Sequence, residues 1–384
     1  MKQGFRIIDS DIHVIEPGDL WLRYIDPAFR AEAPTSPDPG RGVPWDWEVL
    51  GKPIPAYFDR TERGENYAIR VSRAEERFEE LGRQQPRSAG TSPAEMLKAM
   101  DTEGIDVAVV FRTRAAHVIG LDDVDPRLAD AICRAYNDWL RDYCDADRGR
   151  LLPAAQVAPH DVELAVKEAR RAVRDLGAVA LVLPSWLVQQ RPWYDCYYDP
   201  LWAVAQELDV PVAFHGIQVA YQEHVGKRYL ENFALVHAVA HPVEMMMALG
   251  AMLLGGVFER FPRLRGAFLE AHCSWVPAWL YALDERWEKF GNVKRFGLTM
   301  MPSDYFKRQC YVSVDPDEVL VVDTVRAIGD DNIVISTDWP HDDSSYPQAI
   351  NTFLSIEGLS DESRRKILWD NCARLYKVPS SATI

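Results

Sequence analysis

Apolar residues form two alternating kinds of segment along most of this chain. From residue 92 onward, short and nearly uninterrupted apolar runs are separated by longer stretches in which apolar positions recur at the spacing of a helix face. Strands that are covered on both faces, as in parallel sheets, have such uninterrupted runs. With the run that ends at His13, they predict eight strands, at residues 5–13, 107–111, 151–157, 178–183, 210–214, 266–269, 311–314 and 333–336.

Helices are predicted between these strands. Ser92 is a suitable N-cap, with Pro93 in the first helical position and Glu95 three residues after the cap, and Gly104 ends that helix. Further helices are expected at residues 126–146, 162–176, 201–208, 236–258, 275–290 and 319–328, followed by two closing helices at 347–354 and 362–376.

Eight strands separated by helices predict an α/β protein with a (β/α)8 TIM barrel. An open doubly wound sheet is the alternative, but the glycine-rich phosphate loop that usually accompanies it does not follow the first strand. Residues 16–90 are rich in Pro, Gly, Arg and Trp and lack a regular period. We therefore expect one domain over residues 1–384, with a long insertion or cap after strand one and an aromatic-rich loop after strand four.

The composition narrows the range of partners. Hydrophobic residues make up 47% of the 384 residues, and the net charge of −15 argues against nucleic acid, whose binding requires clustered Lys and Arg. No stretch approaches the roughly 20 apolar residues of a membrane span, and we expect no secretory signal. Six cysteines without a C-x-x-C pair favour free thiols, and hence a cytoplasmic protein, over a disulfide or zinc-ribbon scaffold.

Ionisable residues gather at the predicted carboxyl ends of separate strands, which is where TIM barrels place their catalytic groups. Asp11 and His13, two residues apart on a strand, point the same way and make half of a divalent metal site. One shared cation can partner several buried His and Asp side chains that would otherwise each need a partner. The other candidates are His215 after strand five, Glu270 and His272 after strand six, and Asp338 after strand eight.

This ordered set of motifs resembles the amidohydrolase superfamily, and within it the amidohydrolase-related branch (amidohydrolase family 2). That branch contains aminocarboxymuconate semialdehyde decarboxylase and the γ-resorcylate and 5-carboxyvanillate decarboxylases. The resemblance spans nearly the whole chain. It rests on Asp9-Ser10-Asp11-Ile12-His13, Asp199-Pro200-Leu201-Trp202 before Phe214-His215, Glu270-Ala271-His272, Ser336-Thr337-Asp338-Trp339-Pro340-His341 and the closing segment 367–376.

The resemblance implies that Asp11, His13, His215 and Asp338 bind one divalent metal ion, and that His272 and Asp338 are catalytic. His272 would orient water or assist proton transfer, and Asp338 would also accept a proton. The family more often has His-x-His or Glu-x-His at strand one, so Asp11 is either a direct ligand or a support behind His13. Mixed N and O ligands favour Zn²⁺, with Mn²⁺ as the alternative. Residues 183–186 contain no lysine that could be carboxylated to bridge a second metal.

Four polar residues have two interpretations each. Glu270 either orients His272 or belongs to a buried salt bridge. His237 and His241 lie one helical turn apart, a spacing that can chelate metal, but no H-E-x-x-H pattern surrounds them, so a surface or pocket role is expected. Arg112 either grips a substrate carboxylate or forms an ordinary ion pair.

Aromatic side chains crowd the predicted catalytic side. They predict an apolar lid over an aromatic or polyketide-like substrate, or a subunit interface. They are Trp186, Trp193, Tyr194, Tyr197 and Tyr198 after strand four, with Trp45, Trp47 and Tyr57 in the insertion. The residues expected to bind substrate are Arg112, Trp186, His241, Trp339 and His341.

A single metal at the mouth of a barrel supports two reactions. It can activate water to hydrolyse an amide, ester or lactone, or it can hold an acid while a ring carbon is protonated and CO₂ leaves. We predict non-oxidative decarboxylation of an aromatic or unsaturated acid, ahead of hydrolysis. A non-catalytic barrel that binds a ligand is the alternative from another class. The expected partners are a small-molecule substrate and a second copy of the chain in a homodimer.

Overall fold

The computed structural model describes residues 1–35, 47–49, 52–54, 90–113, 115, 119–216, 225, 233–290, 295–341 and 343–378. Most of the predicted insertion, including Trp45 and Tyr57, lies outside these residues, as do the side-chain contacts of Trp47. Within the insertion the structure describes α1 (Leu20–Tyr24), a 3-10 turn (Pro27–Phe29) and an antiparallel pair, β2 (Trp47–Val49) and β3 (Lys52–Ile54).

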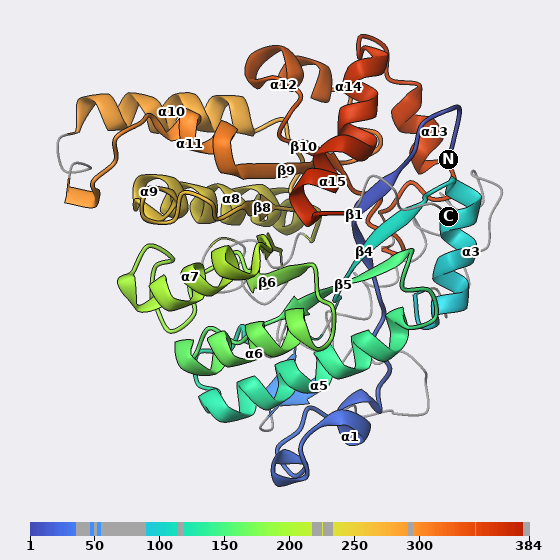
Figure 1. The fold of residues 1–384 in the computed structure, drawn as a ribbon, viewed down its shortest axis with the longest axis vertical. Coiled ribbons are helices and arrows are strands. Elements are labelled where there is room, and N and C mark those ends of the chain that lie inside the picture. The colour runs from blue at the N-terminus through green and yellow to red at the C-terminus, as the bar shows by residue number, and fades with distance from the viewer. Residues whose placement is uncertain are drawn as a thin grey trace.

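Eight parallel strands form the centre of the molecule, ordered as they occur in the chain (Figure 1). They are β1 (Ile8–His13), β4 (Val107–Phe111), β5 (Leu151–Gln156), β6 (Ala180–Pro184), β7 (Val212–His215), β8 (Gly266–Phe268), β9 (Cys310–Val314) and β10 (Ile333–Ile335). The eight predicted strands are confirmed, and so is the (β/α)8 barrel.

The last strand meets the first through side chains as well as main chain. The Ser10 hydroxyl donates to the Ile335 carbonyl at 2.7 Å, and the Ser336 hydroxyl donates to the Asp11 carbonyl at 3.2 Å. Beyond them, the His13 amide donates to the Trp339 carbonyl at 2.7 Å. These bonds connect β1 with the chain around β10, so residues from both ends of the sequence share one rim.

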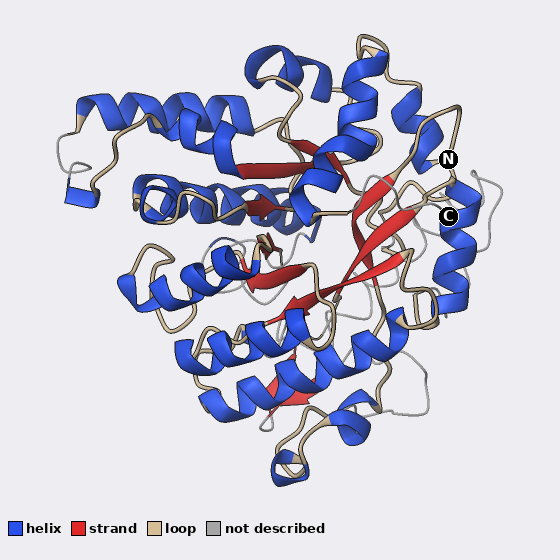
Figure 2. Cartoon of the chain, viewed as in Figure 1, coloured by secondary structure: helices blue, strands red, loops and turns tan. Residues whose placement is uncertain are grey.

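Helices surround the strands as an outer layer, as Figure 2 shows. They are α3 (Pro93–Glu103), α5 (Pro126–Cys144), α6 (Val162–Arg174), α7 (Asp199–Leu208), α8 (Phe233–Leu254), α9 (Val257–Arg260), α10 (Val276–Lys289), α11 (Pro302–Gln309), α12 (Val321–Ile328), α13 (Ala349–Leu354), α14 (Asp361–Arg365) and α15 (Asn371–Tyr376). The sequence did not predict α11. The last predicted helix is interrupted by a π-helical turn at Lys366–Asp370.

The chemistry of its ends explains why α3 begins and stops where the sequence predicts. The Ser92 hydroxyl accepts a hydrogen bond from the Glu95 amide at 3.3 Å, and Pro93 occupies the first turn. Gly104 ends the helix with φ +75°, and a Cβ there would lie 2.9 Å from the Met1 carbonyl oxygen. Only glycine satisfies both constraints without strain.

The closing helix α15 covers the amino-terminal end of the barrel. Asn371 donates to the carbonyl of Ile333, the first residue of β10, at 2.7 Å. Arg374 donates to the hydroxyl of Tyr311, near the start of β9, at 2.9 Å. Because this end is closed by protein, a small molecule must approach the barrel from the carboxyl ends of the strands.

Helix α8 differs from the expectation that no stretch of the chain approaches the length of a membrane span. Residues 234–254 are long and apolar enough, by length and composition, to cross a membrane, although the sequence reading found no such stretch. In the structure α8 packs against β7, α9, α10 and α11, as an outer helix of the barrel does. Core helices of soluble proteins pass the same test of length and composition.

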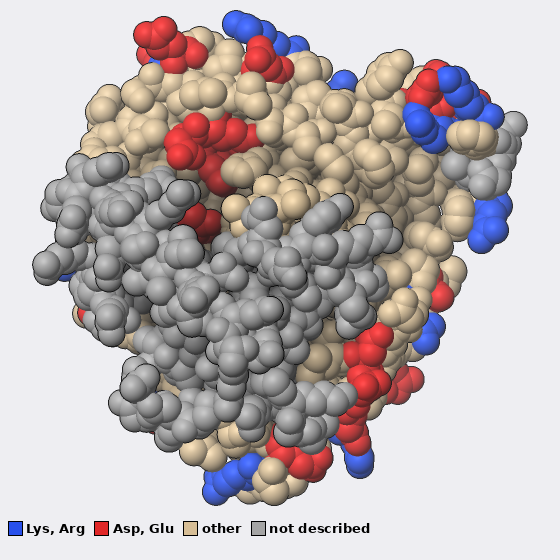
Figure 3. Space-filling model, turned by 180° about the vertical axis from the view of Figure 1, so that it is seen from behind, with Lys and Arg blue, Asp and Glu red and all other residues tan. Residues whose placement is uncertain are grey.

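Figure 3 shows the opposite face of the molecule, on which the coloured Lys and Arg side chains lie in separate groups near the edge.

Candidate metal centre

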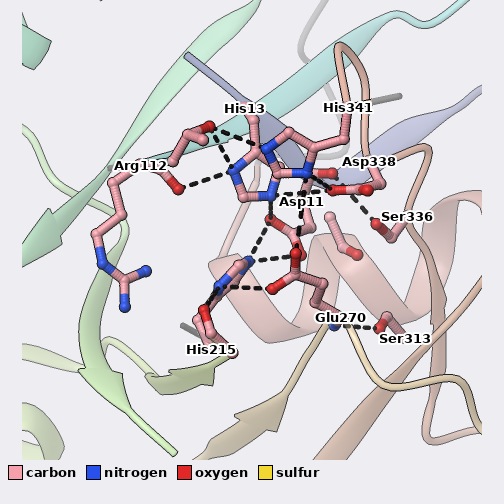
Figure 4. A network of polar contacts seen from close by, with 12 residues as sticks. Asp11, His13, Arg112, His215, Glu270, Ser313, Ser336, Asp338 and His341 are labelled. Atoms are coloured by element: carbon pink, nitrogen blue, oxygen red, sulfur yellow. Dashed lines mark hydrogen bonds and ion pairs between the residues drawn. The ribbon is translucent and has the colours of Figure 1, made fainter. Parts of the chain in front are cut away.

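The carboxyl ends of the strands bring the four predicted metal ligands together (Figure 4). Asp11 and His13 belong to β1, His215 ends β7, and Asp338 follows β10. Their possible ligand atoms fall into two groups, each within 4.8 Å, that share His13. The first group is Asp11, His13 and His215, and the second is His13, Glu270, Asp338 and His341.

The main chain orients the His13 ring. Its Nδ1 lies 2.8 Å from the carbonyl oxygen of Arg112. A carbonyl can only accept, so Nδ1 carries the hydrogen and the lone pair remains on Nε2. That Nε2 lies 3.2 Å from Asp11 Oδ1 and 3.2 Å from Asp338 Oδ1.

The His215 ring is oriented in the same way. Its Nδ1 is 2.9 Å from the Gly216 carbonyl oxygen, and its Nε2 is 3.1 Å from Asp11 Oδ2. A Cβ on Gly216 would lie 2.8 Å from His241 Nδ1 and 2.9 Å from Glu270 Oε2, so glycine permits these side chains to approach. A backbone bond on one ring nitrogen, with the other nitrogen aimed at a carboxylate, is the usual arrangement of a metal-binding histidine.

The contacts between these side chains fit the ligands of one ion. His13 Nε2 and Asp338 Oδ1 are buried and 3.2 Å apart, and the described residues give neither atom a hydrogen bond of good geometry, although His341 Nδ1 also lies 2.7 Å from Asp338 Oδ1. Two ligands that each bind an ion at about 2.1 Å are separated by roughly 3.0 to 3.4 Å in octahedral or tetrahedral geometry. The separations of His13 Nε2 from Asp11 Oδ1 and from Asp338 Oδ1 match those of ligands to a shared cation, and His13 joins the two groups of possible ligands.

Three carboxylates meet at this site, and the raised pKa values of two of them show that their burial and mutual repulsion are unfavourable. Burial raises the pKa of Glu270 well above its usual value, and the nearby charges of Asp338 and Asp11 raise it further. Burial likewise raises the pKa of Asp338, with added repulsion from Asp343 and Asp11. A divalent cation removes such repulsion by supplying the largest local charge.

Asp11 and His215 have the ionisation states that metal ligands need. Burial favours a neutral Asp11, but the charges and hydrogen bonds of His215 and His13 outweigh it and hold the pKa of Asp11 below its usual range. Burial lowers the pKa of His215 to about 4, so the ring is neutral at physiological pH. A carboxylate and a neutral imidazole are the forms that bind metal.

Glu270 lies with the metal ligands. Its Oε2 is 3.1 Å from His215 Nδ1, and its Oε1 is 3.8 Å from His341 Nδ1. The Glu270 amide donates to the Ser313 hydroxyl at 3.0 Å, which fixes the chain where it leaves β8. Of the two interpretations of Glu270, the structure favours neither as stated, because its partners are the histidines of the cluster.

His272 lies outside the two groups of possible ligands. Its Nδ1 pairs with Asp315 Oδ2 at 3.0 Å, and its side chain is 54% exposed. The hydrogen bond to Asp315 raises the pKa of His272 to about 9. Glu270 and His272 both have positive φ, +55° and +59°, so the alternation of a strand does not continue through them. The catalytic role predicted for His272 stays a prediction.

Asp9 and Thr337 support the site, and sequence reasoning missed both. Asp9 Oδ1 accepts hydrogen bonds from the amides of Asp11 at 3.2 Å and Thr337 at 3.1 Å. The Thr337 hydroxyl donates to the other oxygen of Asp9. Asp9 thus connects the strand that carries Asp11 to the loop that carries Asp338. The available signal was a second acidic residue, two positions before Asp11, inside a buried strand.

His341 and His241 both contact the carboxylates of the cluster. His341 Nδ1 lies 2.7 Å from Asp338 Oδ1, and its Nε2 lies 3.0 Å from the Thr113 hydroxyl. His241 Nδ1 is 3.8 Å from Glu270 Oε2. The ring centroid of His237 lies 4.5 Å from that of His241, with the rings tilted by 51°, and His237 Nε2 lies 3.4 Å from Asp343 Oδ2, so the predicted histidine pair lies beside the metal cluster.

Two aromatic side chains in the loop after β6 do not cover the barrel mouth as a lid would. Trp193 and Tyr198 are buried, and Trp193 contacts Phe214 of β7 and Trp202 of α7. These rings therefore fill the layer between strand and helix rather than cover the barrel mouth. The lid interpretation is wrong for both residues.

Two further predicted substrate residues are also buried. Trp186 is 4% exposed and packs on Gly120, where a Cβ would lie 2.4 Å from its ring. Trp339 is 4% exposed, with its ring centroid 6.2 Å from that of Tyr346. Contact of Trp186 and Trp339 with substrate stays a prediction.

Comparison with known proteins decides the family. A family model described as amidohydrolase matches residues 8–378. The chain belongs to the amidohydrolase family. This amidohydrolase is 25% identical to the γ-resorcylate decarboxylase of Polaromonas sp. over 293 residues, which cover 73% of the chain and 86% of that relative. The predicted family is therefore confirmed.

Solved structures agree with the fold of this amidohydrolase. An amidohydrolase from Mycobacterium avium subsp. paratuberculosis has a TM-score of 0.77 and 22% identity, with 97% of this chain and 99% of that chain covered. The 5-carboxyvanillate decarboxylase of Novosphingobium aromaticivorans, complexed with manganese and 4-hydroxy-3-methoxy-5-nitrobenzoic acid, has a TM-score of 0.68 and 20% identity, with 98% and 97% covered.

Proposed function

We propose that this amidohydrolase is a metal-dependent carboxy-lyase that decarboxylates an aromatic or unsaturated acid without an oxidant. The observation that carries the proposal is the gathering of Asp11, His13, His215 and Asp338 at the open end of the barrel, in two groups of possible ligands that share His13. The decarboxylases among its relatives support the reaction class.

The metal we propose is one divalent ion, with Mn²⁺ ahead of Zn²⁺. The four ligands predicted from the sequence supply two imidazoles and two carboxylates, a set that suits Zn²⁺. Glu270 adds a third carboxylate beside them, and oxygen-rich sites suit Mn²⁺ better. Two related decarboxylases of known structure contain manganese, which supports the same choice.

The residues around the ion have different roles in the proposed reaction. Asp11, His13, His215 and Asp338 would hold the divalent cation, which would supply positive charge for the binding of an acidic substrate. Asp338, placed between His13 and His341, accepts a proton, as the resemblance implies, and then gives it to the carbon that bears the carboxylate. The bond from that carbon to the carboxyl carbon then breaks, its electron pair returns to the ring or the unsaturated system, and CO₂ leaves.

Product analysis tests this proposal. The protein, loaded with Mn²⁺ or Zn²⁺, is incubated with a panel of hydroxybenzoic acids and with amides, esters and lactones, and the products are identified by mass spectrometry. We expect CO₂ and the ring product with hydrogen in place of carboxylate. Hydrolysis of any panel member without CO₂ from the acids would favour the hydrolase. No product under any condition would favour a non-catalytic barrel.

We also propose that the enzyme works as a homodimer in the cytoplasm. The free thiols support the cytoplasm, and the partly buried Tyr194 and Tyr197 support the dimer, because aromatic side chains are enriched at subunit interfaces. Light scattering coupled to size exclusion measures the dimer, and a mass of one chain would contradict it.

A further inference from the structure

Glu16 is a buried residue that connects the first strand to the loop after β4. It lies three residues after His13, on the chain that leaves β1, and its side chain is fully buried. Its Oε1 accepts hydrogen bonds from the amides of Thr113 and Ala115, both at 3.0 Å. Both amides belong to the loop that follows β4. One carboxyl oxygen therefore fixes this loop to the first strand at the rim of the barrel.

The loop fixed by Glu16 reaches two neighbouring histidine rings. Arg112, whose side chain is 2% exposed, places its carbonyl oxygen 2.8 Å from His13 Nδ1. The Thr113 hydroxyl lies 3.0 Å from His341 Nε2 and 3.4 Å from His13 Nδ1. The centroids of the two rings are 4.2 Å apart, with their planes tilted by 31°, and Figure 4 shows them side by side. The position of this loop therefore determines the orientation of both rings.

The Thr113 hydroxyl also determines which nitrogen of His341 carries the hydrogen. His13 Nδ1 is an N–H group, so the Thr113 oxygen can only accept from it. The hydrogen of the hydroxyl then points to His341 Nε2, which accepts it. In a neutral ring the other nitrogen, Nδ1, carries the hydrogen. That nitrogen lies 2.7 Å from Asp338 Oδ1, so the N–H side of the ring faces Asp338.

We propose that Glu16 and Thr113 are positioning residues for the proton transfer at Asp338. Glu16 fixes the loop, Thr113 fixes the ring of His341 and its tautomer, and the ring fixes the carboxyl group of Asp338. This inference rests on the proposed function, because that reaction requires Asp338 to give a proton to one carbon of the substrate. A displacement of about 1 Å of a catalytic group can slow a reaction roughly 100-fold, so the orientation of this carboxyl group matters.

Glu103 provides a matched contact away from the metal ligands. It ends α3, is 2% exposed, and accepts hydrogen bonds from the amides of Ala349 at 2.9 Å and Ile350 at 3.1 Å. These amides begin α13, and neither residue belongs to the groups of possible ligands. Glu103 and Glu16 therefore make the same kind of structural contact, but only the loop fixed by Glu16 contacts His13 and His341.

Variants of Thr113 test the role of the hydroxyl. Thr113→Val keeps the size of the side chain and removes the hydroxyl, whereas Thr113→Ser retains it. With Mn²⁺-loaded protein and an acid that it decarboxylates, we expect kcat to fall about tenfold or more in Thr113→Val, with little change in KM. Thr113→Ser should keep most of kcat. An unchanged kcat in Thr113→Val, or an equal loss in both variants, would overturn the role of the hydroxyl.

Variants of Glu16 separate positioning from stability. Glu16→Ala removes the acceptor of two amides, so both Tm and kcat should fall, and Glu16→Gln, which keeps an oxygen acceptor, should recover part of kcat. Glu103→Ala is the control: its Tm should fall as well, but its kcat should stay within about twofold of the unmutated protein. An equal loss of kcat in Glu103→Ala and Glu16→Ala would contradict the proposal. If Glu16→Ala does not fold, Glu16→Gln and Thr113→Val provide the comparison with Glu103→Ala.

Nuclear magnetic resonance of the histidine rings tests the same contact without turnover. The shifts of the two ring nitrogens show which one carries the hydrogen, and the signals of His341 are those lost in His341→Gln. Zn²⁺-loaded protein is used, because Mn²⁺ broadens the signals. We expect hydrogen on Nδ1 of His341 in the unmutated protein and in Glu103→Ala, and a changed pattern in Thr113→Val. Hydrogen on Nε2 in the unmutated protein, or identical His341 signals in Thr113→Val, would contradict the proposal.

The two proposals fail differently. If no acid is decarboxylated but the His341 signals change in Thr113→Val as expected, the proposed reaction is wrong and the contact that orients His341 stands. If acids are decarboxylated and Thr113→Val keeps its kcat, the reaction stands and the positioning role is wrong.

Discussion

Single residues decide the chemistry of this centre. Glu270 and His272 lie two positions apart at the end of β8, yet only Glu270 lies within 4.8 Å of the ligand atoms of His13 and Asp338. His272 instead pairs with Asp315 at the surface. The difference follows from the backbone, since both residues adopt left-handed conformations that end the alternation of a strand.

Paired substitutions test this division. We expect Glu270→Gln to lower kcat/KM for decarboxylation by roughly 10- to 100-fold, as loss of a group that supports a metal centre does. His272→Gln, the matched variant two residues away, should change it by less than about threefold. Steady-state kinetics with saturating metal measures both. A larger loss for His272→Gln than for Glu270→Gln would show that the half-exposed histidine is the catalytic one.

Metal content tests whether Asp11 is a ligand or a support. Asp11 Oδ1 and Oδ2 face the free nitrogens of both His13 and His215, so we expect Asp11→Asn to weaken metal affinity by about 100-fold or more. Asp315→Asn, which changes an aspartate outside the cluster, is the control and should keep its metal. Equilibrium dialysis with elemental analysis provides the affinities, and an unchanged affinity in Asp11→Asn would exclude direct binding.

Residue patterns predicted part of this site. The spacing Asp11-x-His13 and the position of His215 at the end of an apolar run were sufficient to predict these three residues. The position of a residue on a parallel strand determines at which end of the barrel its side chain lies. Glu270 could not be separated from His272, since the backbone turn between them has no signature in the sequence. The support from Asp9 and Thr337 depends on a contact across 328 positions of the chain, which a single sequence does not show.

At the scale of elements, the continuous apolar runs were enough to predict all eight strands. Helix ends with a strong cap, such as that of α3, were also predictable. Helix α11 was missed because it is short and its pattern is mostly polar. The π-helical turn before α15 was missed because it places Trp369 against the barrel interior, a tertiary constraint that the sequence does not display.

Helix α8 carries a prediction about pH. Glu244 is 1% exposed, and neither of its oxygens has a hydrogen bond within the described part of the chain. Burial raises its pKa from 4.5 to about 7. The pKa of this carboxyl group is higher in the folded protein than in the unfolded chain. As the pH rises from the unfolded pKa through the folded pKa, the free energy of unfolding therefore falls, because the folded protein must either keep a proton on Glu244 or bury its charge. The full cost is about 3 kcal/mol above pH 8.

Glu244→Gln should remove this cost. We expect the variant to be more stable than the unmutated protein at pH 8.5, and the two to differ little at pH 4.5. Urea unfolding at a series of pH values measures the difference. The account of Glu244 would fail if the gap between the two proteins were the same at both pH values.

On the scale of the whole molecule, the barrel is closed at one end and concentrates negative charge at the other. Helix α15 seals the amino-terminal end, while Asp11, Glu270 and Asp338 meet at the open end. Removal of a resident cation should therefore lower the stability of the entire domain. At a free metal concentration of 100 times Kd, binding stabilises the folded state by about 2.7 kcal/mol.

Thermal unfolding with and without metal tests this coupling. We expect chelation followed by dialysis to lower Tm by roughly 5 °C or more, and added Mn²⁺ to restore it. His215→Ala is the control, because its Tm should no longer respond to Mn²⁺. A Tm that is the same in the apo and Mn²⁺-loaded proteins would show that the buried carboxylates do not depend on a cation.

The most direct measurement of the central claim is the number of Mn²⁺ ions that each chain binds at this centre. Electron paramagnetic resonance counts free Mn²⁺ as metal-free protein is titrated with the ion. We predict saturation at one ion per chain, with the site lost in Asp338→Asn and in His215→Ala. Saturation at two ions, no binding at all, or full binding in both variants would contradict a single metal held by β1, β7 and the loop after β10.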